Sequence, residues 1–273
     1  MSKVYECPGI AGSGVIATGL AAVATITGDT ILLARSENSA SRAEEAAVAA
    51  CEKTENADAS RLKVTTNPKE LADCDVIVEA IIEEVNAKAR LVEALVEASP
   101  SADLATTTSS LGISEIANAA GVEKLFGLHV FNPVPRMKLV EVCFPSGAAS
   151  ARERALSWCD ALGKTAIEVP DQAGFVVNRL LFPYLFDAAR MVKRTGMEPD
   201  KVDDCMKLGV GHPMGPLALL DFIGLDVAQA IGDALYADSK EATHKPPGLI
   251  IEMIGEGKLG RKSGVGFYGY NRG

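Results

Sequence analysis

The sequence has little of what metal, disulfide and membrane proteins need. It has three histidines, and its six cysteines contain no CxxC pair. We therefore predict no zinc site and no disulfide framework, and we expect reduced thiols in a cytoplasmic protein. No apolar run approaches the ~20 residues that cross a bilayer, and the first residues lack the charged-then-apolar pattern of a signal peptide.

Positive charge is also scarce. The formal net charge is −9, and no block of lysines and arginines occurs. The field of the whole protein therefore repels nucleic acid and anionic lipid, and we expect neither as a partner. An anionic small ligand must be bound by local dipoles and a few placed cations. The length of 273 residues, with 48% hydrophobic and 23% charged residues, is typical of one large or two ordinary globular domains.

A glycine-rich turn near the start predicts a nucleotide-binding unit. An apolar segment that begins at Pro8 leads into Gly12-x-Gly14-x-x-Ala17, and small apolar residues follow with helical spacing. The first glycine permits a tight turn, the second lets a pyrophosphate approach the backbone, and the small third residue lets the helix pack on the strand. Pro8 is unusual in a central strand because it removes a hydrogen-bond donor. The expected cofactor contacts here are Gly12, Gly14, Val15, Ile16 and Ala17.

The end of the next strand indicates the cofactor. The apolar run 30–33 is followed by Ala34, Arg35 and Ser36. NAD-specific sites normally place an acid here, which accepts from the ribose 2′-hydroxyl. Arg35 can instead form bidentate hydrogen bonds with a 2′-phosphate, and Ser36 can donate a further hydrogen bond to that phosphate. We therefore predict NADP(H), with NAD(H) as the alternative. The competing interpretation of Arg35 is a solvated arginine on a loop.

Further apolar runs predict a parallel sheet covered by helices. Buried strands are expected at 75–81, 104–108 and 125–130, and the segments between them have helical spacing. Ser109 and His129 end two of these strands. Because the strand ends of an open parallel sheet line the crevice in which ligands bind, we expect both side chains at the same edge.

A domain boundary is predicted at residues 170–174, where a proline, a glycine and polar residues separate apolar elements. Residues 1–172 are expected to form a dinucleotide-binding domain, and residues 173–273 read as helical. The expected fold is therefore α/β, an N-terminal doubly wound Rossmann-type parallel sheet with a second, all-helical C-terminal domain.

The stretch 127–142 holds the strongest candidate for chemistry. It reads as a strand ending in His129, a turn that contains Pro133 and Pro135, and a second strand that carries Glu141. Such a turn can bring Glu141 back beside His129. A carboxylate against an imidazole fixes its tautomer and stabilises its protonated form, which makes an acid/base pair for neutral pH. The alternative is a structural histidine at a strand end.

The remaining histidines and the tryptophan are interpreted as structural. His212 is expected to pack or cap in its proline- and glycine-rich loop, and His244 is expected to be exposed. Trp158 is expected in the core, on the helix that precedes residue 165.

Together these motifs resemble the 3-hydroxyacyl-CoA dehydrogenases, most closely the short 3-hydroxybutyryl-CoA dehydrogenase branch. The resemblance runs nearly from end to end. It rests on residues 12–14, 78–81, 108–111, 127–135, 137–141, 174–179, 213–216 and 264–268, in the order of the family. It implies an oxidoreductase of fatty acid metabolism that interconverts a short-chain (S)-3-hydroxyacyl-CoA, above all 3-hydroxybutyryl-CoA, and the 3-oxoacyl-CoA.

The resemblance also implies roles for matching residues. His129 is similar to the family's general base for the 3-hydroxyl proton, and Glu141 to its orienting partner. Ser109 and Asn178 resemble the pair that binds the substrate oxygen, and Glu83 is counted with the cofactor contacts. The helical domain would then be a substrate and dimerisation domain, so a homodimer is expected.

Some positions depart from the family's pattern. Ala17 replaces the usual third glycine, and Thr107 stands where many members have asparagine. Lys258, Arg261 and Lys262 are candidate cations for the CoA phosphates, although a solvated tail explains them equally well. Two other functions stay open, a dehydrogenase of a free hydroxy acid or sugar acid and a nucleotide-binding protein without turnover.

Overall fold

The apolar runs of the first part of the chain form one eight-stranded sheet in the computed structural model, which describes residues 4–270. The strands are β1 (Pro8–Ala11), β2 (Thr30–Leu33), β3 (Leu62–Thr65), β4 (Val76–Glu79), β5 (Asp103–Thr106), β6 (Leu125–Val130), β7 (Leu139–Cys143) and β8 (Thr165–Glu168). Their order is β3-β2-β1-β4-β5-β6-β7-β8. Neighbouring strands are parallel except β6 and β7, which pair antiparallel. The predicted doubly wound sheet is confirmed, with a hairpin added at one side.

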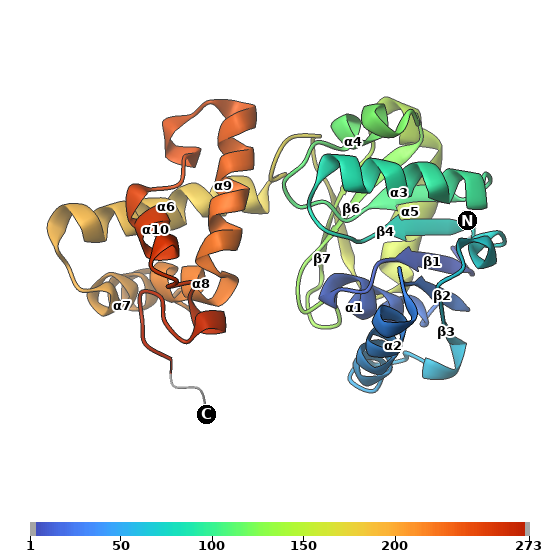
Figure 1. The fold of residues 1–273 in the computed structure, drawn as a ribbon, viewed down its shortest axis with the longest axis horizontal. Coiled ribbons are helices and arrows are strands. Elements are labelled where there is room, and N and C mark those ends of the chain that lie inside the picture. The colour runs from blue at the N-terminus through green and yellow to red at the C-terminus, as the bar shows by residue number, and fades with distance from the viewer. Residues whose placement is uncertain (1–3, 271–273) are drawn as a thin grey trace. The chain divides into compact units, whose positions relative to one another are not determined.

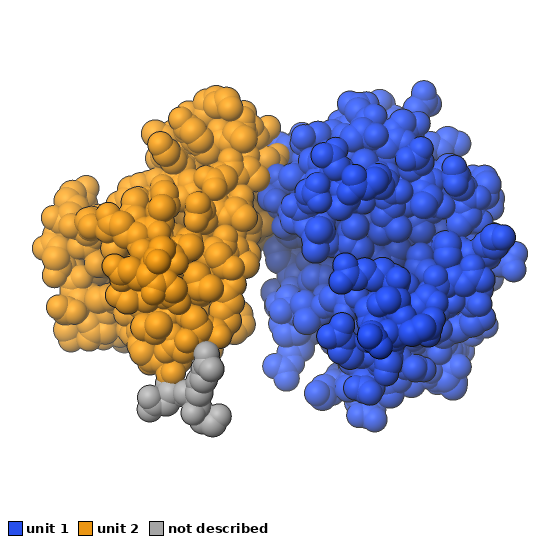
Figure 2. Space-filling view, in the orientation of Figure 1, with its two compact units in different colours: residues 1–172 blue, residues 173–273 orange. Residues whose placement is uncertain are grey.

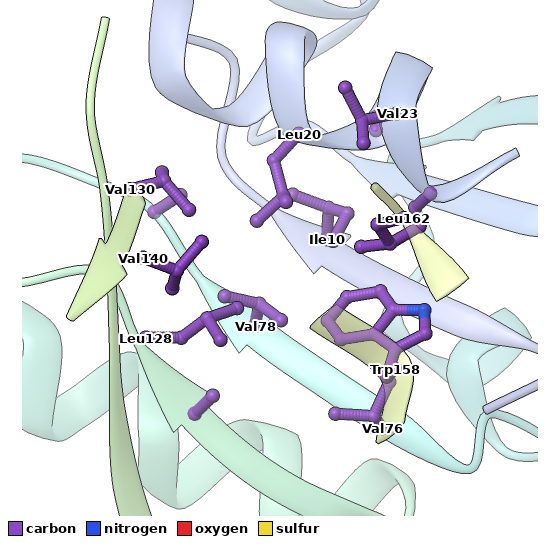
Figure 3. Packing of buried hydrophobic residues seen from close by; sticks show 14 of the residues in the cluster. Ile10, Leu20, Val23, Val76, Val78, Leu128, Val130, Val140, Trp158 and Leu162 are labelled. Atoms are coloured by element: carbon purple, nitrogen blue, oxygen red, sulfur yellow. The ribbon is translucent and has the colours of Figure 1, made fainter. Parts of the chain in front are cut away.

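Helices cover both faces of this sheet. They are α1 (Val15–Ala24), α2 (Glu37–Cys51), α3 (Val85–Ala98), α4 (Ile113–Ala120) and α5 (Arg152–Ala161). α3 and α4 lie on one side of the sheet, and α1 and α2 lie on the other (Figure 1). The core on the second side joins α1, α2 and α5 to the strands. Side chains of this cluster, such as Leu20, Val78 and Trp158, point toward one another between α1, the sheet and α5 (Figure 3).

Trp158 lies in this core, as predicted. Its side chain is fully buried, and its indole Nε1 donates to Thr27 Oγ1 over 3.0 Å. The rings of Trp158 and Tyr5 pack nearly perpendicular to each other, with the centroids 5.5 Å apart. A buried indole needs such a partner for its N–H, and Thr27, in the turn after α1, supplies it.

The chain order of the strands creates a crevice at the end of β1. From β1 the chain moves outward to β2 and β3, and then returns to β4 on the other side of β1. In open α/β sheets, ligands bind at such a switch point, outside the carboxyl ends of the strands. Pro8 is the first residue of β1, where its missing N–H interrupts the ladder least. The glycine turn that follows β1 therefore lies at the expected ligand crevice.

The division of the chain falls at Gln172, where the first compact unit ends and the second begins with Ala173 (Figure 2). The second unit contains α6 (Val177–Thr195), α7 (Pro199–Val210), α8 (Pro216–Ile223), α9 (Leu225–Ser239) and α10 (Gly248–Gly255). Up to residue 270 it holds isolated bridges but no strand. The prediction of an all-helical C-terminal part is confirmed.

Two buried carboxylates hold the end of the second unit. Asp221 on α8 accepts from the backbone N–H groups of Phe267 and Tyr268 at 2.9 and 3.0 Å, and from Tyr270 Oη. Asp203 on α7 accepts from Tyr268 Oη at 2.8 Å. The last described segment is therefore fixed on α7 and α8 by hydrogen bonds.

Within residues 4–270, no helix has the length and hydrophobicity of a membrane span.

The expectation that His244 is exposed is wrong. Its side chain is buried, and its Nδ1 lies within hydrogen-bond distance of Ser239 Oγ. The cause is Arg190 on α6. Its Nη2 donates to the backbone carbonyls of Ala242, Thr243 and Lys245, and these hydrogen bonds hold the polar turn against the helices.

The expectation that His212 packs in its loop is confirmed. Its ring lies nearly perpendicular to that of Tyr184, and its Nδ1 lies 3.2 Å from the Tyr184 hydroxyl.

Candidate active site

The β6–β7 hairpin brings His129 and Glu141 together. The antiparallel register places the two residues directly opposite each other. His129 Nδ1 lies 2.7 Å from Glu141 Oε2, and the side chains are 6% and 2% exposed. Because an ionised carboxylate can only accept, Nδ1 carries the proton and the lone pair lies on Nε2. This tautomer is the one in which Nε2 can accept a proton from a substrate.

The glycine turn after β1 fits a dinucleotide. Gly12 has φ +154°, and a Cβ there would lie 2.2 Å from the carbonyl oxygen of Ala80, so only glycine is accommodated. At Gly14, the N-cap of α1, a Cβ would meet no atom within 4 Å, so its outer side offers room for a phosphate. The first turn of α1 contains no acidic residue, which leaves its amides and dipole available to an anion.

The other residues of the glycine turn differ in their solvent exposure. Val15 is 69% exposed, Ile16 is half-buried and Ala17 is fully buried. A Cβ at Gly12 would lie 3.0 Å from Ala17 Cβ. A larger residue at position 17 would therefore crowd the turn, in agreement with the requirement for a small third residue.

The segment after β2 presents a cation and an acid. Arg35 is exposed directly after this strand. Ser36 is the N-cap of α2: its Oγ accepts from Ser39 N, and Ser39 Oγ accepts from Ser36 N at 3.1 Å. Sequence reasoning missed this capping box. It also missed Glu37, whose carboxylate accepts from Thr66 Oγ1 at 2.5 Å and stands two residues after Arg35.

Glu83 organises the loop that carries Ser109. Its Oε1 accepts from the backbone N–H groups of Ser109 and Ser110 at 2.7 and 2.8 Å, and from the Thr108 hydroxyl at 2.8 Å. Burial raises the pKa of the Glu83 carboxyl, but the ammonium of Lys88 and these donated bonds outweigh burial and hold the pKa below its usual range. Glu83, expected only as a cofactor contact, therefore also shapes the loop after β5.

A buried ion pair lies beneath this loop, and sequence reasoning missed it. Lys88 and Glu79 have side chains that are 1% and 0% exposed, and Lys88 Nζ lies 2.9 Å from Glu79 Oε1. Thr106 Oγ1 donates to Glu79 Oε2 at 2.6 Å, and Lys88 Nζ lies 3.4 Å from Glu83 Oε2. The sequence did contain a signal for this pair, because Glu79 ends an apolar strand and a buried carboxylate requires a counter-ion.

A pocket of about 410 Å³ adjoins the turn that follows His129. It is lined by α1, by α2 and by residues 132–136, and its charged lining residues are Lys53 and Arg136. Both carry positive charge in a chain of net charge −9. This pocket is therefore suited to an anionic group.

The second unit holds the other predicted site residues. Asn178 is the second residue of α6 and is 9% exposed, and its part in catalysis stays a prediction. Lys258 pairs with Glu256, and Lys262 pairs with Asp226. Arg261 lies over the ring of Phe222 at 5.1 Å. A role of these cations in binding CoA likewise stays a prediction.

Comparison with known proteins gives matches along the whole described chain. A model of the NAD binding domain of 3-hydroxyacyl-CoA dehydrogenase matches residues 9–172, and a model of the C-terminal domain matches residues 174–270. The 3-hydroxybutyryl-CoA dehydrogenase of Mycobacterium tuberculosis is 36% identical over 99% of this chain and 100% of its own. The human mitochondrial hydroxyacyl-coenzyme A dehydrogenase is 36% identical over 96% of this chain and 90% of its own.

Solved structures give the same result. M. tuberculosis FadB2 has a TM-score of 0.91 at 34% identity, over 98% of this chain and 100% of that chain. The (S)-3-hydroxybutyryl-CoA dehydrogenase PaaH1 from Ralstonia eutropha has a TM-score of 0.92 at 30% identity, with the same coverage of 98% and 100%. Both similarities extend through the sheet and the helical unit.

Proposed function

Because the chain belongs to the 3-hydroxyacyl-CoA dehydrogenase family, we propose that it oxidises a short-chain (S)-3-hydroxyacyl-CoA reversibly, with NADP(H) as the preferred cofactor. The proposed substrate is 3-hydroxybutyryl-CoA, and the product is the 3-oxoacyl-CoA. The observation that carries this proposal is the buried pair of His129 and Glu141, 2.7 Å apart, on a hairpin of the nucleotide-binding sheet.

Each site residue then has a defined task. His129 Nε2 takes the proton of the 3-hydroxyl during oxidation and returns it during reduction. Glu141 holds the ring and offsets the charge of the imidazolium. Ser109 and Asn178 donate to the substrate oxygen as negative charge develops on it. The nicotinamide cofactor, when bound, supplies or accepts the hydride at C3.

The proposed cofactor preference rests on the end of β2. Arg35 stands where an NAD-specific site usually has an acid, and its exposed guanidinium can bind a 2′-phosphate. Two features weigh against a strict preference, because Ser36 already caps α2 and Glu37 adds negative charge nearby. NADPH is therefore proposed as the better of two usable cofactors.

The cationic pocket beside the catalytic hairpin is the proposed site for the anionic part of CoA. Lys53 and Arg136 line it, and the turn that follows His129 forms one wall. Lys53→Glu should raise the KM for acetoacetyl-CoA and leave kcat nearly unchanged, since the reacting groups are untouched. An unchanged KM in both Lys53→Glu and Arg136→Glu would place the CoA elsewhere.

The decisive assay is nicotinamide oxidation with acetoacetyl-CoA, run in parallel with NADPH and NADH. Fast use of NADPH and slow use of NADH would support the reaction, the substrate class and the cofactor preference together. Preference for NADH would keep the reaction and overturn the cofactor argument. Tight nucleotide binding without turnover would favour a non-catalytic protein, and turnover with free hydroxy acids instead of thioesters would favour the other dehydrogenase alternative.

A further inference from the structure

The turn between His129 and Glu141 contains backbone carbonyls that need hydrogen-bond donors from outside the turn. Residues 131–138 connect β6 to β7, and the prolines within them have no backbone N–H. The carbonyl of Pro133 accepts from the N–H groups of Arg136 and Met137 at 3.0 and 3.1 Å, as in a turn of helix. The carbonyls that follow it resemble those at the end of a helix, which need donors from outside the turn.

Lys164 supplies those donors. Its Nζ lies 2.5 Å from the carbonyl oxygen of Val134, 2.8 Å from that of Met137 and 3.5 Å from that of Pro135. An ammonium at the negative end of such a turn is favourable both as a donor and as a charge. Burial lowers the pKa of this ammonium, so the carbonyls have partly replaced its water.

The position of Lys164 is itself fixed by the fold. It follows Gly163, which has φ +68°, and its N–H donates to the carbonyl of Cys159 at 2.9 Å, which closes the end of α5. The next residue begins β8, and its N–H, that of Thr165, donates to the carbonyl of Lys138 at 2.7 Å. The ammonium therefore reaches the turn from a rigid helix–strand junction.

The same turn also contacts α1. Val134 is buried, and a Cβ at Gly19 would lie 3.1 Å from Val134 Cβ, so the absence of a side chain at Gly19 allows this approach. The turn is thus held both by α1 and by Lys164. Its residues also form a wall of the cationic pocket.

We propose that Lys164 is a positioning residue of the active site, which holds the 131–138 turn and, through it, the alignment of His129 with Glu141. Its kinetic test rests on the proposed function, whereas its structural test does not. Removing the ammonium leaves three carbonyls of one turn without their donor. The hairpin should then fluctuate, and the imidazole should lose its orientation toward the substrate.

The experiment compares Lys164→Met with Lys138→Met. Both remove one positive charge and keep a long apolar stem, but Lys138 is an exposed residue of the same turn. We expect Lys164→Met to lower kcat for acetoacetyl-CoA about 10- to 100-fold, with an unchanged dissociation constant for the cofactor. Hydrogen–deuterium exchange should become faster in residues 131–138 and stay unchanged in α3 and α4. Lys138→Met should behave as the wild type in both measurements.

An unchanged kcat in Lys164→Met would overturn the proposal, and so would faster exchange spread over the whole first unit, which indicates a general structural role. If the wild type does not turn over acetoacetyl-CoA, the proposed function fails, and the exchange data alone then decide the role of Lys164. Should Lys164→Met be recovered unfolded, Lys164→Gln takes its place with the same two measurements and the same outcomes.

Discussion

The hydrogen bond between Glu141 and His129 fixes the orientation and the tautomer of the imidazole. Nδ1 faces the carboxylate at 2.7 Å, and both groups are buried, so the ring cannot rotate without losing a charge-assisted hydrogen bond. Nε2 is therefore the nitrogen that would accept the proton of the substrate in the proposed reaction. This orientation follows from a single pair of opposed residues in the β6–β7 register.

His129→Gln should separate catalysis from binding. Glutamine cannot act as the base, so we expect kcat to fall by about 10²–10⁴-fold, the usual contribution of general acid–base catalysis. The dissociation constant of the nicotinamide cofactor, measured by fluorescence titration, should not change. His212→Gln is the matched control, because His212 packs on Tyr184 in the second unit. Near-normal turnover of His129→Gln would remove this residue from the proposed role.

Arg35→Glu should reverse the cofactor preference. The new carboxylate repels a 2′-phosphate and can accept from a ribose 2′-hydroxyl. The ratio of kcat/KM for NADPH to that for NADH should fall about 10- to 100-fold, the worth of one hydrogen bond to a charged group. Arg42→Glu, one and a half turns into the exposed face of α2, controls for charge alone. Equal ratios in the wild type and Arg35→Glu would contradict the 2′-phosphate assignment.

At the scale of elements, the ends of β4 and β5 depend on a chain of ionic contacts. Glu79 ends β4, Lys88 lies in α3, and Glu83 between them holds the loop after β5. The ammonium of Lys88 thus faces two carboxylates, one fully buried and one partly exposed. The loop with Ser109 is therefore held by Glu83, which precedes it by the whole of α3 and β5.

Lys88→Met should show the cost of breaking this arrangement. It leaves the buried Glu79 carboxylate without a counter-ion, so the free energy of unfolding should fall by about 3–5 kcal/mol. Adding Glu79→Gln should recover part of the loss. Trp158, the one tryptophan of the chain, lies in the first unit and reports its unfolding in urea by fluorescence. A loss no larger than that of the exposed control Lys53→Met would contradict a structural ion pair.

The Glu83 cluster should make stability depend on pH. The folded state lowers the pKa of Glu83, because Lys88 and the loop N–H groups favour the carboxylate despite burial. The stabilisation is therefore complete above the unfolded pKa of about 4.3 and is lost as the pH falls through the lower folded value. The stability difference between wild type and Glu83→Gln, followed by Trp158 fluorescence, should shrink on acidification below about pH 4.3. A difference independent of pH would exclude this effect.

At the scale of the whole molecule, the second unit exposes large apolar side chains around one pocket. Leu180 and Phe222 are 71% and 54% exposed, and both line a pocket of about 630 Å³ with Tyr184 and Met214. Exposed apolar surface of this kind is typical of an interface with another protein chain. The expected homodimer stays a prediction, and we propose that it forms through this surface.

Leu180→Glu and Phe222→Glu should weaken this dimer. A carboxylate buried in an apolar interface lacks a counter-ion, so each variant should sediment as a monomer at concentrations where the wild type is a dimer. The matched control is Ile167→Glu, which adds the same charge at an exposed apolar residue of β8 in the first unit. A monomeric wild type, or a dimer unaffected by both variants, would contradict the proposal.

Much of the molecule follows from local sequence patterns. The glycine turn can be predicted from residues that are close in the sequence, because Gly12 and Ala17 belong to one strand–turn–helix unit. The return of Glu141 to His129 needs only a hairpin, since a short strand–turn–strand stretch sets its own register. The helical second unit follows from continuous helical spacing after residue 173. In each case the residues that interact are close in the sequence, and their spacing carries the information.

Other features depend on partners that are distant in the sequence, and only the tertiary structure determined them. Glu79 meets Thr106 because β4 pairs with β5, and Lys164 meets the 131–138 turn because β8 joins β7. His244 is buried because Arg190, on another helix, binds the surrounding carbonyls. The local sequence around these residues does not predict such contacts, because strand order and helix packing determine which distant residues meet. The sequence by itself determined which groups can do chemistry, and the packing of distant segments decided what holds them in place.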